Sequence, residues 1–245
     1  MILLKRLHQQ SIFYLRMTYI KSGFQSILFS LVLISNLNAL QAQILVHEEP
    51  RHRPVFQNKD IRILNVLVPP GDTSLYHMHT TPSFFIRLTN TITGSQVHGE
   101  AKKAGKSQSG EIRFENLAPP NNRVHRVWNA DKDTFHVMDV ELLMKKADFD
   151  QKPMVLPHLK LEIDTSWVRA YRLNLLKGIE FKSKNKKQSL VLVSLNTTKL
   201  EISKNGNKEL QTLKPGSFFV LKRRQSFSVN NTSEDTSQFV LLELP

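Results

Sequence analysis

Short segments in which apolar and polar residues alternate dominate the chain from Asp60 onward, and turn-forming Gly, Pro, Asn and Asp residues separate them. Because successive side chains of a β-strand point to opposite faces, this alternation predicts strands with one buried face. We expect two sets of strands, over residues 61–68, 74–79, 83–90, 111–117, 123–129 and 134–143, then 168–176, 189–196, 199–203, 217–221, 226–230 and 238–244. Many short strands between turn signals predict an all-β protein made of sandwiches or barrels.

The two sets of strands look like two copies of one unit. Residues 125–142 align without gaps on residues 227–244, a separation of 102 positions (227 − 125). Identical residues stand at positions 127/229, 129/231, 133/235, 134/236, 141/243 and 142/244. With a separation of 106 positions (189 − 83), residues 83–90 also match residues 189–196. A repeat of this length is too long for a solenoid unit and fits two tandem β-domains.

Changes in composition along the chain predict the domain boundaries. Residues 151–160 contain two prolines and are predicted to be a linker between one domain at 60–150 and a second at 161–245. Residues 142–150 are the one stretch with a helical pattern. Residues 43–59 are polar, and we expect an extended, mobile segment that carries His47 and His52 outside the domains.

The amino terminus has the features of a secretory signal. The apolar run at residues 26–35 follows Lys21, and the first 42 positions hold no Asp or Glu. The run is short for a membrane span, so we expect a signal peptide over residues 1–42 with cleavage after Ala42, and Met17 is an alternative start. The alternative is an uncleaved anchor. Export predicts a bacterial periplasmic or secreted protein without a stable membrane anchor.

The remaining composition excludes several classes of chemistry. The 245-residue chain has no cysteine, which excludes disulfides, zinc–thiolate sites, iron–sulfur clusters and a cysteine nucleophile. The formal net charge is +13; without the first 42 residues, 30 basic residues (34 − 4) face 21 acidic ones. These charges are dispersed and form no recognition helix or basic stripe, so we expect no nucleic-acid partner.

Three histidines of the first domain have the spacing of metal ligands. His77 and His79 stand two residues apart in a predicted strand, so both imidazoles point to one face, about 7 Å apart along the strand. His125 adds a third imidazole from a distant strand. Imidazole-rich sites suit Fe, Ni, Cu and Zn. A single His-x-His pair is often incidental, so the surrounding residues have to carry the assignment.

Those surrounding residues resemble the cupin superfamily, and the whole exported part resembles a bicupin. Gly71, five further residues and His77-Met78-His79 match the first half of the family's first motif. His125 and Asn129, with Pro120 upstream, match the end of its second motif, although Asn122 stands at a glycine position. The resemblance implies two tandem cupin-type (double-stranded β-helix or jelly-roll) barrels, with His77, His79 and His125 as metal ligands.

The chain departs from the cupin pattern at the fourth ligand. Ser83 or Phe84 stands where the family has a glutamate, so the site resembles the all-histidine subgroup typified by thiol dioxygenases. The resemblance implies a divalent transition metal, Fe2+ before Mn, Ni, Cu or Zn, with open positions for substrate and oxygen. The same alignment places Ser183, Asn185 and Phe227 at the ligand positions of the second domain, which is then a metal-free copy.

Two further residues are candidates for a catalytic role. His136 is predicted to face the metal as a supporting donor or acid/base, with a solvent-facing side chain as the alternative. Arg87 follows an apolar run and is predicted to hold a substrate carboxylate, with a surface ion pair as the alternative. His98 is a weaker candidate for a replacement ligand.

The sequence supports three functional hypotheses. The first is an exported Fe(II)-dependent dioxygenase that acts on a small organic molecule. The others are a non-catalytic cupin that binds a small acid or sugar, and a metal-dependent isomerase or lyase. A cupin fold does not decide among them, because function depends on the site. The resemblance also implies a homodimer.

Overall fold

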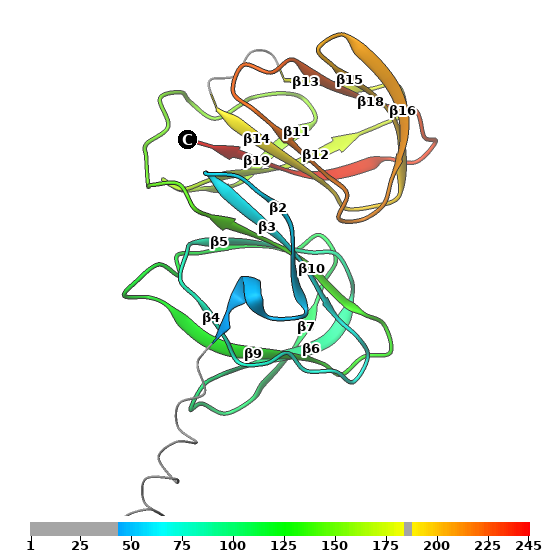
Figure 1. Ribbon diagram of the computed structural model, residues 1–245. Helices are drawn as coiled ribbons and strands as arrows, with labels where there is room; N and C mark the ends of the chain where they lie inside the picture. The colour runs from blue at the N-terminus through cyan, green and yellow to red at the C-terminus, as the bar shows by residue number, and fades with distance from the viewer. Residues whose placement is uncertain (1–43, 184–187) are drawn as a thin grey trace, which may run out of the picture. The chain divides into compact units, whose positions relative to one another are not determined.

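Four β-sheets build the described part of the chain, residues 44–183 and 188–245 of the computed structural model (Figure 1). The predicted signal peptide and Asn185 lie outside the described residues. Among the described residues, no helix has the length and apolar character needed to cross a membrane. The prediction of an all-β protein is confirmed, since the described elements are strands and one 3-10 helix, η1, at Val46–Glu48.

The first barrel consists of two five-stranded sheets, in the orders β1-β4-β9-β6-β7 and β2-β3-β10-β5-β8. Its strands are β1 (Ile44–Leu45), β2 (His52–Gln57), β3 (Ile61–Val68), β4 (His77–His79), β5 (Ser83–Arg87), β6 (Thr91–Val97), β7 (Lys103–Ser107), β8 (Ile112–Glu115), β9 (Arg123–Asn129) and β10 (Phe135–Leu142). The β1–β4 pair is parallel and the other pairs are antiparallel.

The second barrel repeats this architecture with a five-stranded sheet, β11-β12-β19-β14-β17, and a four-stranded sheet, β13-β18-β15-β16. Its strands are β11 (Leu159–Asp164), β12 (Arg169–Leu175), β13 (Glu180–Ser183), β14 (Ser189–Ser194), β15 (Thr198–Lys204), β16 (Asn207–Leu213), β17 (Phe218–Leu221), β18 (Phe227–Asn231) and β19 (Ser237–Leu244).

Three local predictions differ from the structure. The segment before Asp60 is not an extended, mobile segment outside the domains. β1 pairs with β4 and β2 pairs with β3, so the first barrel already includes Ile44. Residues 142–150 form no helix, because Leu142 ends β10 and the following residues are irregular. The predicted linker also packs onto the second barrel, where Met154 is buried and its N–H donates to the hydroxyl of Tyr171.

The duplication is confirmed by the strand pairing. β10 and β19, which align at a separation of 102 positions (237 − 135), occupy the same central place in their sheets. The upstream match was one residue out of register. Phe85 faces Asp139 and Leu192 faces Leu241, so β5 and β14 correspond at a separation of 107 positions (192 − 85), not 106.

Equivalent polar side chains tie the corresponding loops of both barrels. The amide of Asn129 donates to the carbonyls of Val68 and Asp133, at 2.9 and 2.7 Å. The amide of Asn231 makes the same two bonds in the second barrel, to Leu175 and Asp235, both at 2.8 Å. Both asparagines are buried, and each uses its amide group to donate to two backbone carbonyls.

The apolar side chains form three clusters whose members alternate along the strands. In the first barrel Leu64, Val66, Phe135 and Val137 fill the interior. Met138 and Val140 belong instead to a cluster shared by β3, β5 and β10 with β12, β14 and β19, so they contact the second barrel. The second barrel has its own apolar interior, which includes Leu241. β10 is therefore buried on both faces.

The asparagine ties predict matched losses of stability. Asn129→Ala and Asn231→Ala each remove two hydrogen bonds from a buried amide group to backbone carbonyls, so each should lower the free energy of unfolding by about 2 kcal/mol. Denaturant unfolding measures this loss. Asn121→Ala is the control, because that side chain is exposed and should change stability by less than about 0.5 kcal/mol. A neutral effect of either buried substitution would contradict this account.

Candidate metal centre

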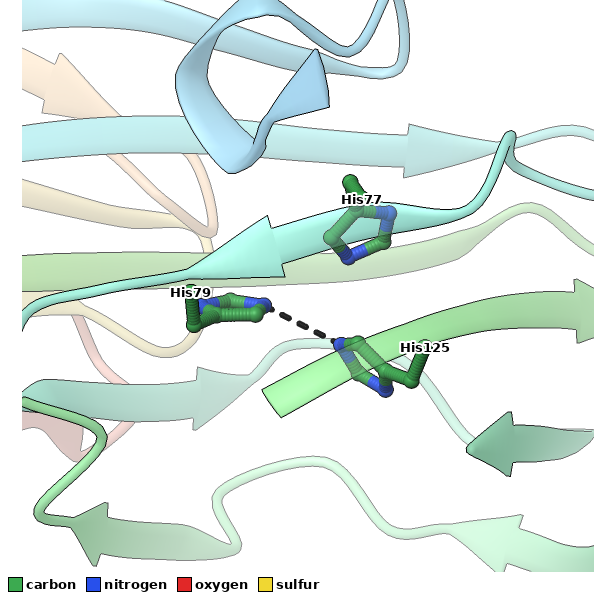
Figure 2. Close-up of side chains that lie close together, drawn as sticks. All are labelled: His77, His79 and His125. Carbon is green, nitrogen blue, oxygen red and sulfur yellow. Dashed lines mark hydrogen bonds between the residues drawn. The ribbon is translucent and has the colours of Figure 1, made fainter. Parts of the chain in front are cut away.

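The interior of the first barrel brings the three predicted ligands together (Figure 2). β4 and β9 pair with His77 directly opposite His125, and the alternation along β4 places His79 on the same face as His77. One nitrogen of each ring lies within 4.8 Å of the others. The Nε2 atoms of His79 and His125 are 3.1 Å apart (Figure 2). The structure therefore clusters imidazoles from sequence positions almost 50 residues apart.

The cluster fits a divalent metal ion. Metal–imidazole bonds of about 2.1 Å place two ligand nitrogens about 3 to 4 Å apart. The Nε2 atoms of His79 and His125 have this spacing, and the three ligand nitrogens all lie within 4.8 Å of one another. Nε2 of His77 and Nδ1 of His79 are buried without a hydrogen-bond partner among the described residues. The Nδ1 of His77 lies 2.9 Å from the carbonyl of Leu75, which accepts its proton and leaves Nε2 free to bind a metal.

Burial keeps the three rings neutral, as metal binding requires. It lowers the pKa of His77 to about 3, with a further contribution from the nearby His52. Burial also lowers the pKa of His79 and of His125 well below the ordinary value, and the neighbouring histidines add to this effect. Three imidazoles that resist protonation present nitrogen lone pairs over a wide range of pH.

A cavity of about 140 Å³ adjoins His79 and His125. Apolar side chains line one part of it, among them Phe85, Val127 and Phe135. Besides the histidines, the ionisable lining consists of Arg87, Arg113 and Arg123 with three acidic residues, Glu111, Glu115 and Asp139. Burial raises the pKa of Asp139 and so favours its neutral form, which leaves three guanidinium groups against the two glutamates. A cavity of about 150 Å³ accommodates benzene, so one small ring fits this space.

The arginines are held in place by the two glutamates. Arg123 contacts Glu115 at 2.5 Å, and Arg113 pairs with the same carboxylate. Burial lowers the pKa of Arg113, and the guanidinium groups of Arg123 and Arg87 lower it further. Arg123 stands directly opposite His79 on β9 and two residues before His125. It therefore places a fixed cation beside the histidine cluster.

Arg87 reaches this cavity, as the carboxylate-binding hypothesis requires. It shares the inward face of β5 with Phe85, while Phe84 and Ile86 pack against the second barrel. Its guanidinium contacts Glu111 at 2.9 Å and the carbonyl of Lys106 at 3.0 Å. The ion pair of the alternative prediction is present, and binding of a substrate carboxylate by Arg87 stays a prediction.

His136 does not reach the metal cluster, which corrects its predicted role. Its neighbours Phe135 and Val137 line the cavity, so His136 points to the opposite face of β10. There its Nε2 lies 2.6 Å from the side-chain oxygen of Asn65, and the ring packs beside Gly216 of the second barrel. His98 stacks edge-on against Tyr76 and is also absent from the cluster.

Sequence reasoning missed a second group of residues at the site. His52, expected to be mobile, is only 4% exposed, and its ring centroid lies 4.3 Å from that of His77. Its Nδ1 is 2.6 Å from the carboxylate of Glu49. Burial alone would raise the pKa of Glu49, but the bond from His52 and two backbone N–H groups lower it to about 2. The spacing of Glu49 and His52, three residues apart, was the feature of the sequence that could have indicated this contact.

Asp139 is a further residue at the site that was not predicted from the sequence. It lies on β10 between apolar residues and is 1% exposed. Its Oδ2 lies 3.7 Å from Nδ1 of His79. Burial, and then the nearby Glu141, raise the pKa of Asp139 well above its ordinary value. A carboxylate between apolar residues of a buried strand is rare, and that position was the signal in the sequence.

The second barrel lacks the cluster. Ser183 stands opposite Phe227 in the β13–β18 pair, just as His77 stands opposite His125. Leu241 takes the position of Asp139, in contact with an apolar core. The described ligand positions of the second barrel thus offer no imidazole, in agreement with the alignment.

Solved structures with the same fold support the bicupin assignment. AerE from Microcystis aeruginosa has 15% identity and a TM-score of 0.58, with 80% of this chain and 98% of that chain covered. Salicylate 1,2-dioxygenase from Pseudaminobacter salicylatoxidans has 12% identity and a TM-score of 0.57, covering 79% of this chain and 76% of that one.

A structure of that dioxygenase with gentisate gives a TM-score of 0.58 at 12% identity, with 87% and 78% of the two chains covered. No family model matches the sequence, and neither does any curated protein sequence. The chain therefore has the bicupin fold, with two tandem cupin-type barrels and a three-histidine cluster in the first.

The neutral rings predict a pH-dependent stability of the metal-free protein. Between pH 6.5 and about 3 the folded state binds fewer protons than the unfolded state, so stability falls as the pH falls. The raised pKa of Asp139 acts in the opposite direction. The double variant His77→Ser/His125→Phe replaces two ligands by their counterparts in the second barrel. Its free energy of unfolding should fall less between pH 6 and 5 than that of the wild type, by up to about 1.4 kcal/mol per pH unit for each histidine removed.

Denaturant unfolding in the presence of a chelator at a series of pH values measures this difference. Because Asp139 remains in both proteins, the comparison isolates the histidines. Parallel pH profiles for the wild type and the double variant would show that the cluster is protonated alike in both states, contrary to this prediction.

Proposed function

We propose that this chain is an exported, metal-dependent dioxygenase of the cupin fold that acts on a small organic acid. The observation that carries the proposal is the three-histidine cluster beside a small, arginine-lined cavity. His77, His79 and His125 would hold a divalent transition metal, with Fe2+ favoured over Mn, Ni, Cu and Zn. When bound, such an ion supplies redox chemistry toward O2 and Lewis acidity toward the substrate.

The cavity selects the substrate in this proposal. Arg123 and Arg113 would bind a carboxylate, with Arg87 completing the positive wall. Phe85, Phe135 and Val127 would pack against the body of the substrate and exclude water. A dioxygenase adds both atoms of O2 to its substrate and needs no external reductant. The likeness to salicylate 1,2-dioxygenase supports this choice only at the level of the fold.

Residues of the chain would also orient the ligands and the substrate. The carbonyl of Leu75 fixes the tautomer of His77. Glu49 holds Nδ1 of His52, which leaves the other ring nitrogen of His52 on the side of the cavity. The signal-like amino terminus supports export to the periplasm or the medium. We also keep a homodimer within the proposal, by analogy with cupins.

Metal analysis of the purified protein tests the first part of the proposal. We expect close to one equivalent of metal in the wild type and less than a tenth of that in His77→Ala/His125→Ala. His158→Ala, which changes a histidine at the second barrel, should retain the full amount. Absence of metal after growth and reconstitution with Fe2+, Mn2+, Ni2+, Cu2+ and Zn2+ would contradict the proposal.

Oxygen consumption by the iron-loaded protein tests the second part. Salicylate, gentisate and related aromatic carboxylates should stimulate uptake of one O2 per product. Arg123→Met should raise the KM for a carboxylate substrate at least tenfold and leave the binding of its neutral amide analogue unchanged, since only the carboxylate needs the guanidinium. Tight binding of a carboxylate without oxygen uptake would instead support the non-catalytic hypothesis.

A further inference from the structure

Asp139 is a buried carboxylate without a hydrogen-bond partner among the described residues. Both of its oxygens are inaccessible to solvent and lack a donor. Isolated burial of a carboxylate is strongly unfavourable, whether the group stays charged or takes up a proton. Its neighbours along β10 are the apolar Met138 and Val140, and the next residue on its own face is a second buried carboxylate, Glu141. The fold alone therefore gives no reason for an aspartate at this position.

Two polar groups lie close to Asp139: the hydroxyl of Ser83, which lowers its pKa slightly against the effect of burial, and the ring of a predicted metal ligand. Its Oδ2 lies 3.7 Å from Nδ1 of His79, a nitrogen that is also buried and unpartnered. The other nitrogen of the same ring, Nε2, faces His125 at 3.1 Å (Figure 2). The two nitrogens of His79 thus have different surroundings, with a carboxylate on one side and the metal cluster on the other.

This arrangement matches what a metal-binding imidazole requires. To present the Nε2 lone pair to a metal, the ring must carry its proton on Nδ1, and an acceptor beside Nδ1 favours that tautomer. His77 has such an acceptor in the carbonyl of Leu75, at 2.9 Å. For His79 the carboxyl group beside Nδ1 is that of Asp139, at 3.7 Å, which is longer than a hydrogen bond.

The second barrel supplies an internal comparison. Asp139 pairs with Leu64 and Phe85, and Leu241 pairs in the same way with Tyr171 and Leu192. Leu241 is fully buried in an apolar core. That barrel has Ser183 and Phe227 where the first has His77 and His125. Within one chain, the carboxylate accompanies the imidazoles and is replaced by leucine where they are absent.

We infer that Asp139 is a positioning residue that accepts the Nδ1 proton of His79 and thereby directs Nε2 of His79 toward the metal. It supports metal binding and destabilises the metal-free fold. The inference rests on the metal site proposed above. It also gives the site a carboxylate close to the ligands, although Ser83 stands at the position where cupins have a glutamate ligand.

Two substitutions separate this role from a structural one. Asp139→Leu introduces the residue of the second barrel, which the fold accommodates. It should lower the affinity for Zn2+ and Co2+ ten- to hundredfold and raise the melting temperature of the metal-free protein. Asp139→Asn keeps an acceptor oxygen for the Nδ1–H group and should stay within about threefold of the wild-type affinity. Competition with a chelator measures the affinities.

The Co2+ absorption spectrum adds a readout of ligand geometry. We expect an altered spectrum for Asp139→Leu and a near-wild-type spectrum for Asp139→Asn. Met138→Val is the control, because it introduces the second-barrel residue on the opposite face of the same strand and should leave metal affinity unchanged.

Three results would overturn the inference. Wild-type metal affinity in Asp139→Leu would show that His79 needs no acceptor. Equal losses of affinity in the Leu and Asn variants would assign the effect to charge and exclude the hydrogen bond. A lower melting temperature of metal-free Asp139→Leu would make Asp139 a structural residue. Failure of the wild type itself to bind Zn2+ or Co2+ is a distinct result, which overturns the proposed function together with this inference.

Discussion

Burial of both faces of β10 is the constraint on which the site depends. Odd-numbered residues of this strand, such as Val137 and Asp139, face the barrel interior, and the even-numbered Met138 and Val140 contact the second barrel. A shift of one residue in the pairing of β10 with β3 and β5 would exchange the two faces. Asp139 would then enter an apolar contact, and Met138 would face His79. The contact between the barrels therefore also fixes the register that places the carboxylate at the site.

Comparison of the two barrels separates the residues that stabilise the fold from those that form the candidate metal site. Asn129 and Asn231 make the same pair of loop contacts, and the cross-strand pairs Arg62–Glu141 and Arg169–Glu243 also recur. None of these interactions requires an imidazole nearby. The second barrel shows that the ligand positions accept serine and phenylalanine without loss of the fold. The histidines and Asp139 are thus an addition to a frame that is stable without them.

Much of this organisation follows from local sequence pattern. The alternation of apolar residues predicted most of the strands. The repeat at 102 positions identified the two barrels because β10 and β19 have the same length and start equally far after the ends of β9 and β18. The i, i+2 spacing of His77 and His79 sufficed to place two ligands on one face. The strand pairing of His125 with His77 depends on the fold, and there the cupin resemblance supplied what local pattern could not.

The errors have equally specific causes. β10 is apolar on both faces, so no alternation reveals that His136 and Asp139 point in opposite directions. His52 and Glu49 lie in a polar, proline-containing segment, and only pairing with β3 and contacts around Leu75 bury them. The one-residue error between β5 and β14 arose because residues 83–90 and 189–196 are both apolar and match almost equally well in adjacent registers.

The charges at the site lead to the preference for an anionic substrate. Three neutral imidazoles leave the charge of a divalent ion uncompensated, and the nearby arginines add further positive charge. Glu111 and Glu115 are engaged with these arginines, which leaves Asp139 as the carboxylate nearest to His79. In a cupin with a glutamate ligand, the protein itself would supply a compensating charge at the metal. Here Ser83 stands at that position, so under the proposed function a carboxylate on the substrate would provide the compensation, and binding of the substrate and of the metal would favour each other.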